Sequence, residues 1–301
     1  MPTDVDVRSH GTRLAAWHVP ATCEDWTTPA GRPLVVMAHG FGCTKDSGLL
    51  PFAERFAAAG ADVLLFDYRG FADSDGAQRQ VVDHRRHRED YHAAIAHARS
   101  MPGIDPDRIV VWGSSYSGGH VVVVAADDPR VAGVISQGAA MDGLLAVLEI
   151  LRYAGPRQLL RLSLHAVRGA VGERLGRAPR LIPIVGPPGS LAAITSHDGE
   201  SGYGSIAGAS FRNEMRVSGI LPIMRNRPVR AAPRLQAPLF LVVATRDTIA
   251  PPAAVEKVAA RAAGRVVVER YDVGHFDIYL GEPFEKSVAA QVDFLASVVG
   301  R

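Results

Sequence analysis

The chain has 301 residues, of which 47% are hydrophobic and 21% charged, so it is neither a disordered nor a fibrous protein. No apolar run approaches the roughly 18 residues of a membrane span, and the N-terminal segment lacks the apolar stretch of a secretory signal. The two cysteines, Cys23 and Cys43, are too few for a disulfide framework or a thiolate zinc site. We therefore expect a cytoplasmic protein with no membrane partner.

The net charge of +2 is distributed unevenly along the chain. Residues 143–235 contain thirteen Arg, no Lys and five acidic residues, a local charge of +8, and the remainder carries −6. A nucleic-acid-binding protein would present a basic surface on its main body, because phosphate is repelled by acidic groups. We therefore expect no nucleic-acid partner.

Short runs of aliphatic residues alternate with helical patterns along most of the chain. The expected strands are 12–17 (an antiparallel edge strand), 34–39, 62–67, 108–113, 131–136, 239–245 and 265–271, and the expected helices are 49–59, 82–98, 115–126, 252–263 and 283–299. Most of these strands are apolar throughout, which is typical of strands buried on both faces of a parallel sheet. The alternation predicts a mostly parallel, doubly wound α/β fold.

The alternation stops after the strand at 131–136 and restarts near Pro238. The intervening stretch begins with an apolar helical pattern and continues in pieces punctuated by Pro and Gly, such as LIPIVGPPGS. We therefore predict an α/β core formed by residues 1–141 and 236–301, with a helical cap inserted at 142–235.

The strongest motif is VVWGSSYSGGHVVVVAA, residues 110–126. A buried strand ends at Gly113 and a helix begins almost at once, which places Ser115 on a tight turn at the carboxyl edge of the sheet, where a nucleophile can sit. The usual pattern is G-x-S-x-G, and here Ser117 replaces the second Gly, with Gly118 and Gly119 after it. The alternative is a Gly-rich turn in which the Ser merely caps the helix.

A second Gly-containing turn, His39-Gly40-Phe41-Gly42, follows the first long buried strand. In an enzyme whose nucleophile lies on a strand-turn-helix, two backbone N–H groups bind the negatively charged oxygen that forms during the reaction. One comes from the residue after the nucleophile and the other from such a Gly-containing turn. The candidate donors are therefore the amides of Tyr116 and Phe41. His39 is expected to be a turn residue rather than a second base.

Two further candidates stand just beyond the ends of late strands. Asp247 follows the strand at 239–245, and His275 follows the strand at 265–271. Taken singly, the Asp could cap a helix and the His could lie exposed in a loop. Together with Ser115, they give the chain order nucleophile, acid, base, and His275 could then take the Ser115 proton while Asp247 orients the imidazole.

Three other carboxylates are candidates for the same role. Asp142, past the strand at 131–136, is the alternative acid, whereas Asp272 and Asp277 flank His275 too closely in sequence to orient it well.

At this point the chain resembles the α/β-hydrolase superfamily, over residues 30–141 and 238–300. The segment FDYRGFADSDG, residues 66–76, looks like a loop of the serine-hydrolase branch that contains X-prolyl dipeptidyl peptidase and S33-type relatives. The resemblance implies a small-molecule substrate, cleavage of a carboxylic ester (EC 3.1.1), thioester or amide through an acyl-enzyme, and neither metal nor organic cofactor. The alternatives are a C–C bond hydrolase acting on a diketone with the same residues, and a non-catalytic binding protein.

The remaining motifs have no expected catalytic role. The run DHRRHREDYH, residues 83–92, is expected to be a solvated helix face rather than a metal site, Cys43 an inert thiol, and Asp67 and Arg69 structural residues. The predicted cap carries three arginines near its start that either contact the core and solvent or bind an anionic substrate group: Arg152, Arg157 and Arg161. The sequence gives no indication of the oligomeric state.

Overall fold

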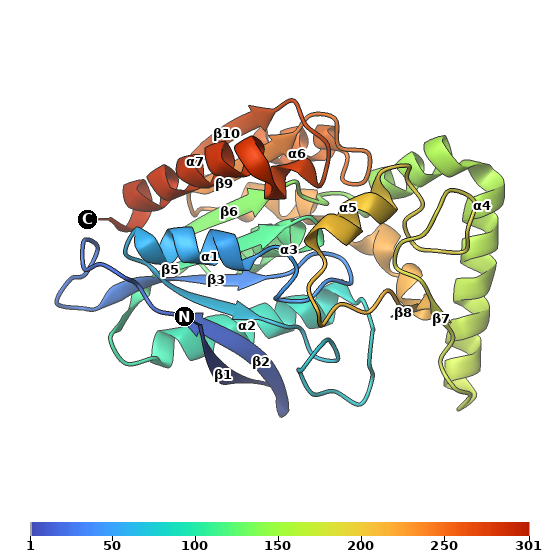
Figure 1. The fold of residues 1–301 in the computed structure, drawn as a ribbon, viewed down its shortest axis with the longest axis horizontal. Coiled ribbons are helices and arrows are strands. Elements are labelled where there is room, and N and C mark those ends of the chain that lie inside the picture. The colour runs from blue at the N-terminus through green and yellow to red at the C-terminus, as the bar shows by residue number, and fades with distance from the viewer. Residues whose placement is uncertain (1, 301) are drawn as a thin grey trace.

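The structure is a computed structural model that describes residues 2–300. Its centre is an eight-stranded sheet in the order β1-β2-β4-β3-β5-β6-β9-β10 (Figure 1). The strands are β1 (Thr3–Ser9), β2 (Thr12–Val19), β3 (Arg32–Ala38), β4 (Asp62–Phe66), β5 (Ile104–Ser114), β6 (Gly133–Gln137), β9 (Leu239–Ala244) and β10 (Val266–Tyr271). The first two run antiparallel and the other six parallel, so the fold is the expected mostly parallel α/β architecture.

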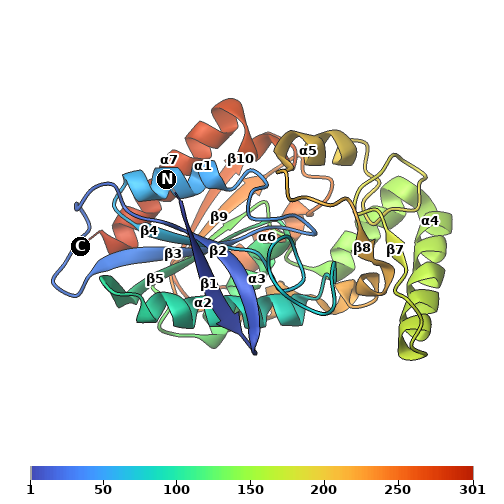
Figure 2. The same cartoon turned by 60° about the horizontal axis from the view of Figure 1, so that its bottom comes forward.

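Helices cover both faces of the sheet (Figures 1 and 2). One face carries α1 (Leu50–Ala58) and α7 (Gly281–Val299), and the other carries α2 (His84–Ser100), α3 (Tyr116–Asp127) and α6 (Pro252–Ala259). This division follows from right-handed crossovers. Helix α1 connects β3 to β4 in one direction along the sheet, whereas α2, α3 and α6 lie in connections that run in the opposite direction, so they fall on the other face.

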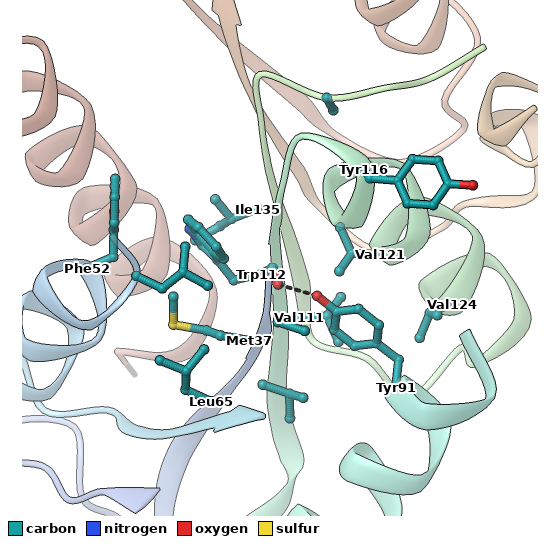
Figure 3. Close-up of a cluster of buried hydrophobic side chains, with 14 of the residues drawn as sticks. Met37, Phe52, Leu65, Tyr91, Val111, Trp112, Tyr116, Val121, Val124 and Ile135 are labelled. Carbon is teal, nitrogen blue, oxygen red and sulfur yellow. Dashed lines mark hydrogen bonds between the residues drawn. The ribbon is translucent and has the colours of Figure 1, made fainter. Parts of the chain in front are cut away.

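The core lies on both sides of β5 (Figure 3). The Trp112 side chain packs against Phe52 of α1, with ring centroids 5.3 Å apart, and its Nε1 donates to Gln291 Oε1 at 2.7 Å. On the opposite face, the Tyr91 hydroxyl of α2 donates to the Trp112 carbonyl at 2.9 Å. Burial on both faces is why this strand is apolar at consecutive positions.

All seven expected strands and all five expected helices are present, to within a few residues at their ends. The strand β1 was not predicted, although its sequence TDVDVRS alternates polar and apolar residues as a half-buried strand does. It pairs with β2 through a two-residue turn at His10 and Gly11, whose φ angles are 47° and 79°. Two positive φ angles give the turn the twist that a tight hairpin needs.

The chain between β6 and β9 gathers beyond the carboxyl ends of the central strands (Figure 1). It contains α4 (Gly143–Arg174), β7 (Leu181–Ile182), α5 (Gly199–Ile206), β8 (Met215–Arg216) and four short 3₁₀ helices at 217–220, 223–225, 228–230 and 232–234. Helix α4 is kinked at Gly155, whose φ of 78° and ψ of 170° are not helical and which precedes Pro156. None of the helices found in residues 2–300 has the length and hydropathy of a membrane span.

The expectation that residues 83–92 form a solvated face is wrong for half of the helix. His84, His87 and Asp90 are buried, and with Tyr91 they form the inward stripe of α2. Burial lowers the pKa of His84 to about 4 and that of His87 well below its ordinary value, so both rings are neutral near pH 7.

Asp90 ties the N-terminal hairpin to the rest of the fold. Its carboxylate accepts hydrogen bonds from Ser9 Oγ at 2.7 Å, from the Arg69 backbone N–H at 3.0 Å and from Arg69 Nε at 2.6 Å. Nearby, Asp67 accepts from both the backbone N–H and the ammonium of Lys45, at 2.6 and 2.8 Å. The loop at 66–76 is therefore held by Asp67 and Arg69, as expected.

We predict that Asp90→Ala lowers the free energy of unfolding by about 3–5 kcal/mol, because it removes the buried carboxylate that pairs with the Arg69 guanidinium and leaves it the exposed Glu89. Urea denaturation measures the change. The control is Glu89→Ala, whose 46% exposed side chain lies 3.2 Å from the same guanidinium and should contribute less than about 1 kcal/mol. Equal losses in the two variants would contradict the assignment.

Candidate active site

Ser115 lies on the turn between β5 and α3, in a backbone conformation that L-residues seldom adopt. Its φ is 57° and its ψ is −118°. Hydrogen bonds to β6 and to the residues after it stabilise this strained conformation. The Ser115 N–H donates to the Gln137 carbonyl at 2.8 Å, and the Ser115 carbonyl accepts from the Ala140 N–H at 2.9 Å. The turn places the hydroxyl at the carboxyl edge of the sheet.

The neighbouring positions have no room for larger residues. A Cβ on Gly113 would lie 2.4 Å from the Ser117 carbonyl oxygen, and one on Gly119 would lie 2.4 Å from the Ala140 carbonyl oxygen. Ser117, which departs from the usual motif, is fully buried, and its hydroxyl lies 2.8 Å from the Ala38 carbonyl and accepts from the Ser114 N–H at 2.8 Å. The hydroxyl therefore ties the turn to β3, which a glycine could not do.

The structure brings the three predicted residues together in one hydrogen-bonded line. His275 Nε2 lies 3.1 Å from Ser115 Oγ, and His275 Nδ1 lies 2.6 Å from Asp247 Oδ2. The other carboxylate oxygen of Asp247 accepts from the backbone N–H groups of Ile249 and Ala250, at 2.8 and 2.7 Å. These two bonds fix the carboxylate so that its free oxygen faces the imidazole.

The other candidate acids are engaged elsewhere. Asp142 accepts two hydrogen bonds from Arg227, at 2.9 and 2.7 Å, and caps α4 by accepting from the Leu144 N–H. Asp272 lies 3.3 Å from Arg246, and Asp277 accepts from the Gly274 N–H. Geometry therefore favours Asp247 as the partner of His275.

The two predicted oxyanion donors flank Ser115. Neither the Phe41 nor the Tyr116 backbone N–H donates to an acceptor within residues 2–300. The turn approaches the serine closely, since a Cβ on Gly40 would lie 3.1 Å from Ser115 Cβ. Phe41 is held by a hydrogen bond that its carbonyl accepts from the Tyr203 hydroxyl at 2.8 Å. Both amides are thus free to bind an oxygen.

Two nearby titratable groups do not complete a second catalytic pair. His39 is buried, its Nδ1 lies 3.0 Å from the Gly40 carbonyl, and burial lowers its pKa to about 4. Cys43 is buried as well, and burial raises the pKa of its thiol to about 12, so it stays protonated near neutral pH.

Opposing influences set the pKa of His275. Burial alone would lower it, but the charge of Asp247 and its hydrogen bond to Nδ1 outweigh burial, with a smaller contribution from Asp198. The result is a pKa above the ordinary value of 6.5. The buried carboxylate therefore favours the imidazolium that forms when the histidine takes a proton.

An apolar pocket opens beside Ser115. It holds about 660 Å³ of empty space, part of which is open solvent. One wall is a single face of α4, and its members recur at helical spacing: Gly143, Ala146, Ile150 and Tyr153. The few polar groups of the lining include the Asn226 amide.

The three arginines proposed as an alternative anion site do not line this pocket. Arg152, Arg157 and Arg161 are exposed. Arg152 pairs with Glu149, and Arg161 Nη1 donates to the Gly189 carbonyl at 3.3 Å. Sequence reasoning missed Asn226, because it lies in the irregular chain between β6 and β9 and belongs to no motif.

Comparison with known proteins places this geometry in a family. The family model described as "Serine aminopeptidase, S33" matches residues 29–278. The quorum-quenching protein AidA of Acinetobacter baumannii is 39% identical over 300 residues, covering 99% of this chain and 95% of that protein. The thiohydrolase aneE of Aspergillus aculeatus is 28% identical over 281 residues, covering 90% and 87%.

Solved structures show the same fold. DcsB in complex with its substrate analogue has a TM-score of 0.83 at 20% identity, and the α/β hydrolase GrgF from Penicillium sp. sh18 has a TM-score of 0.80 at 22% identity. Both alignments cover 100% of each chain. The S33-type part of the expected resemblance is confirmed, and the link to X-prolyl dipeptidyl peptidase stays a prediction. The chain belongs to the S33 serine aminopeptidase family of α/β-hydrolase enzymes.

Proposed function

We propose that the chain is a serine hydrolase that cleaves a carboxylic ester or thioester through an acyl-enzyme on Ser115. The observation that carries the proposal is the continuous line from Asp247 through His275 to Ser115, which ends at an apolar pocket. The chemistry needs a base that can take the serine proton, a fixed carboxylate behind it and a cavity for the acyl group. This site provides all three.

The first half of the reaction forms the acyl-enzyme. His275 Nε2 accepts the proton of Ser115 Oγ as the oxygen attacks the substrate carbonyl carbon. The charge that develops on the carbonyl oxygen is stabilised by the Phe41 and Tyr116 amides, which have no competing acceptor. His275 then donates its proton to the departing alcohol or thiol.

Water completes the cycle. His275 accepts a proton from water as the water oxygen attacks the acyl carbon, and the proton returns to Ser115 Oγ when the acid leaves. In this proposal residues 142–235 act as a cap, because they supply the α4 wall of the pocket. The apolar lining favours an aliphatic or aromatic acyl group over a charged one.

The names of relatives guide the choice of test substrates. A relative named as a thiohydrolase supports testing thioesters beside oxygen esters. A lactone is added because it is a cyclic ester, with the same carbonyl group for Ser115 to attack. A panel of p-nitrophenyl esters of rising chain length, with matched thioester, lactone, amide and diketone compounds, tests the reaction class.

We predict that Ser115→Ala lowers kcat on the best ester by about 10⁴- to 10⁶-fold with its circular dichroism spectrum and Tm preserved, because the nucleophile is lost. It should also abolish labelling by a fluorophosphonate probe. The control, Ser100→Ala at the end of α2, should be labelled normally. A Ser115→Ala protein that retains a tenth of the activity would exclude this nucleophile.

We predict that Asp247→Asn lowers kcat by about 10⁴-fold, because the amide no longer favours the imidazole tautomer with the proton on Nδ1. Asp142→Asn is the matched control, since its carboxylate pairs with Arg227 instead, and it should have a much smaller effect. Steady-state kinetics on one ester decides between them. The reverse order of effects would assign the acid to Asp142.

We predict that kcat/KM rises with pH through an inflection above 6.5, because the pKa of His275 is raised and only the neutral imidazole can accept the serine proton. Activity is therefore lost as pH falls through the raised pKa. In the residual activity of Asp247→Asn the inflection should move down, since the burial that lowers the pKa then acts with less opposition. An inflection unmoved by that variant would show that another group controls the profile.

A further inference from the structure

Asn226 is a polar residue set into the wall of the apolar pocket. Its side chain is 1% exposed, and the residue lines the same cavity as Ser115. Its backbone is held on both sides, because its N–H donates to the Ile223 carbonyl at 3.0 Å and its carbonyl accepts from the Gly143 N–H at 2.8 Å. The amide therefore has a fixed position relative to the pocket.

Arg88 of α2 orients this amide. Its Nη2 donates to Asn226 Oδ1, which identifies the oxygen end of the side chain and leaves Nδ2 as the free donor. Burial lowers the pKa of the Arg88 guanidinium, which forms no ion pair with a carboxylate of residues 2–300. The charge thus lies behind the pocket wall with no carboxylate in direct contact.

The charges of Asp83 and Asp127 raise the pKa of Arg88 against the effect of burial, whereas the titratable rings packed around it are neutral. Burial lowers the pKa of His84 to about 4, and it lowers those of His87 and His120 well below their ordinary value, so these rings are neutral. Burial raises the pKa of Tyr116, against the influence of Arg88 and the Asn226 amide, so its hydroxyl stays protonated. Arg88 is then the charged member of this group of six side chains.

Several buried polar atoms of this group have no hydrogen-bond partner among the described residues. They are the Tyr116 hydroxyl, Arg88 Nε and ring nitrogens of His84, His87 and His120. The Asn226 amide differs from them because it lines the pocket, with its oxygen already bonded to Arg88. An asparagine amide nitrogen carries two protons, so Nδ2 can donate to an oxygen that a ligand brings into the pocket.

We propose that Asn226, positioned by Arg88, is a specificity-determining donor for an oxygen atom carried by the substrate. The group that fills the pocket would be an aliphatic chain bearing a carbonyl or hydroxyl oxygen, which accepts a hydrogen bond from Nδ2. The positive charge of Arg88 strengthens that bond by polarising the amide through Oδ1. This inference rests on the proposed function, because it concerns the pocket beside Ser115.

The test compares esters that differ in a single group. The probes are the ethyl ester of octanoic acid and a set of esters in which a ketone replaces one methylene at successive positions, with products measured by chromatography. The wild-type enzyme should prefer at least one ketone ester by about tenfold to hundredfold in kcat/KM, the discrimination that a buried hydrogen bond supplies.

The decisive variant is Asn226→Asp. Aspartate has the same shape and still accepts from Arg88, as an ion pair that should maintain the Tm, but it has no proton to donate to the ligand. The preference for the ketone ester should fall to about one or below. Asn213→Asp is the matched control, because Asn213 bonds to Val185 outside the pocket, and it should keep the wild-type ratio.

Arg88 is tested as a positioning residue. Arg88→Met removes the bond that orients the amide and should reduce the ketone preference part of the way, chiefly through KM. Arg88→Lys keeps a donor and should recover part of the lost preference. A ratio that Arg88→Met leaves at the wild-type value would overturn the positioning role.

The outcomes separate this inference from the proposed function. Hydrolysis of the plain ester with no preference for any ketone ester would overturn the inference and leave the serine hydrolase intact. If no ester is hydrolysed, the proposed function fails, and calorimetric binding of the same pair to Ser115→Ala still decides the inference. Equal dissociation constants would overturn it, and tighter binding of a ketone ester, lost on Asn226→Asp, would support it.

Discussion

The arrangement of the whole site depends on one strained turn. Ser115 has a positive φ, and this conformation persists because the serine backbone is bonded on both sides to the chain of β6 and the residues that follow it. The same turn directs the hydroxyl out of the sheet and leaves the Tyr116 amide unpaired at the start of α3. A single backbone constraint therefore positions both the nucleophile and one candidate oxyanion donor, and it requires the glycine at 113.

Strand order supplies the partners of that turn. Asp247 and His275 follow β9 and β10, which are neighbours in the sheet, and β6 alone separates β9 from β5. The chain leaving β6 must therefore pass close to the acid and the base. Gly138 stands there with a φ of 48°, and a Cβ at this position would lie 3.9 Å from Asp247 Oδ2 and 4.0 Å from His275 Nδ1. The parallel sheet thus brings three residues distant in sequence to one edge, with Gly138 directly after β6 beside them.

The parts that could be predicted from the sequence are those whose signal is local. Continuous apolar runs indicated the central strands, and the short spacing from Gly113 to Gly119 indicated the turn at Ser115. Long-range packing determines what was missed. The strand β1 pairs with β2 and is bonded through Ser9 to Asp90 of the distant helix α2, and one wall of the pocket comes from α4. His84 and His87 belong to the polar run 83–92, which predicted a solvated face, but both are buried and burial makes them neutral.

The charge near the pocket depends on where individual arginines lie and not on how many arginines the cap segment contains. The excess of arginine between residues 143 and 235 suggested an anion site in the cap, yet several of these groups are paired, as Arg227 is with Asp142, Arg216 with Glu173 and Arg234 with Asp127. The guanidinium that lies behind the pocket wall is Arg88, which comes from the net acidic part of the chain. A carboxylate compensates the charge of the arginine that it pairs with, so that arginine attracts a ligand only weakly. An arginine bonded to a neutral amide instead polarises that amide. The substrate preference is therefore expected to depend on one unpaired charge on α2 and not on the net charge of the cap.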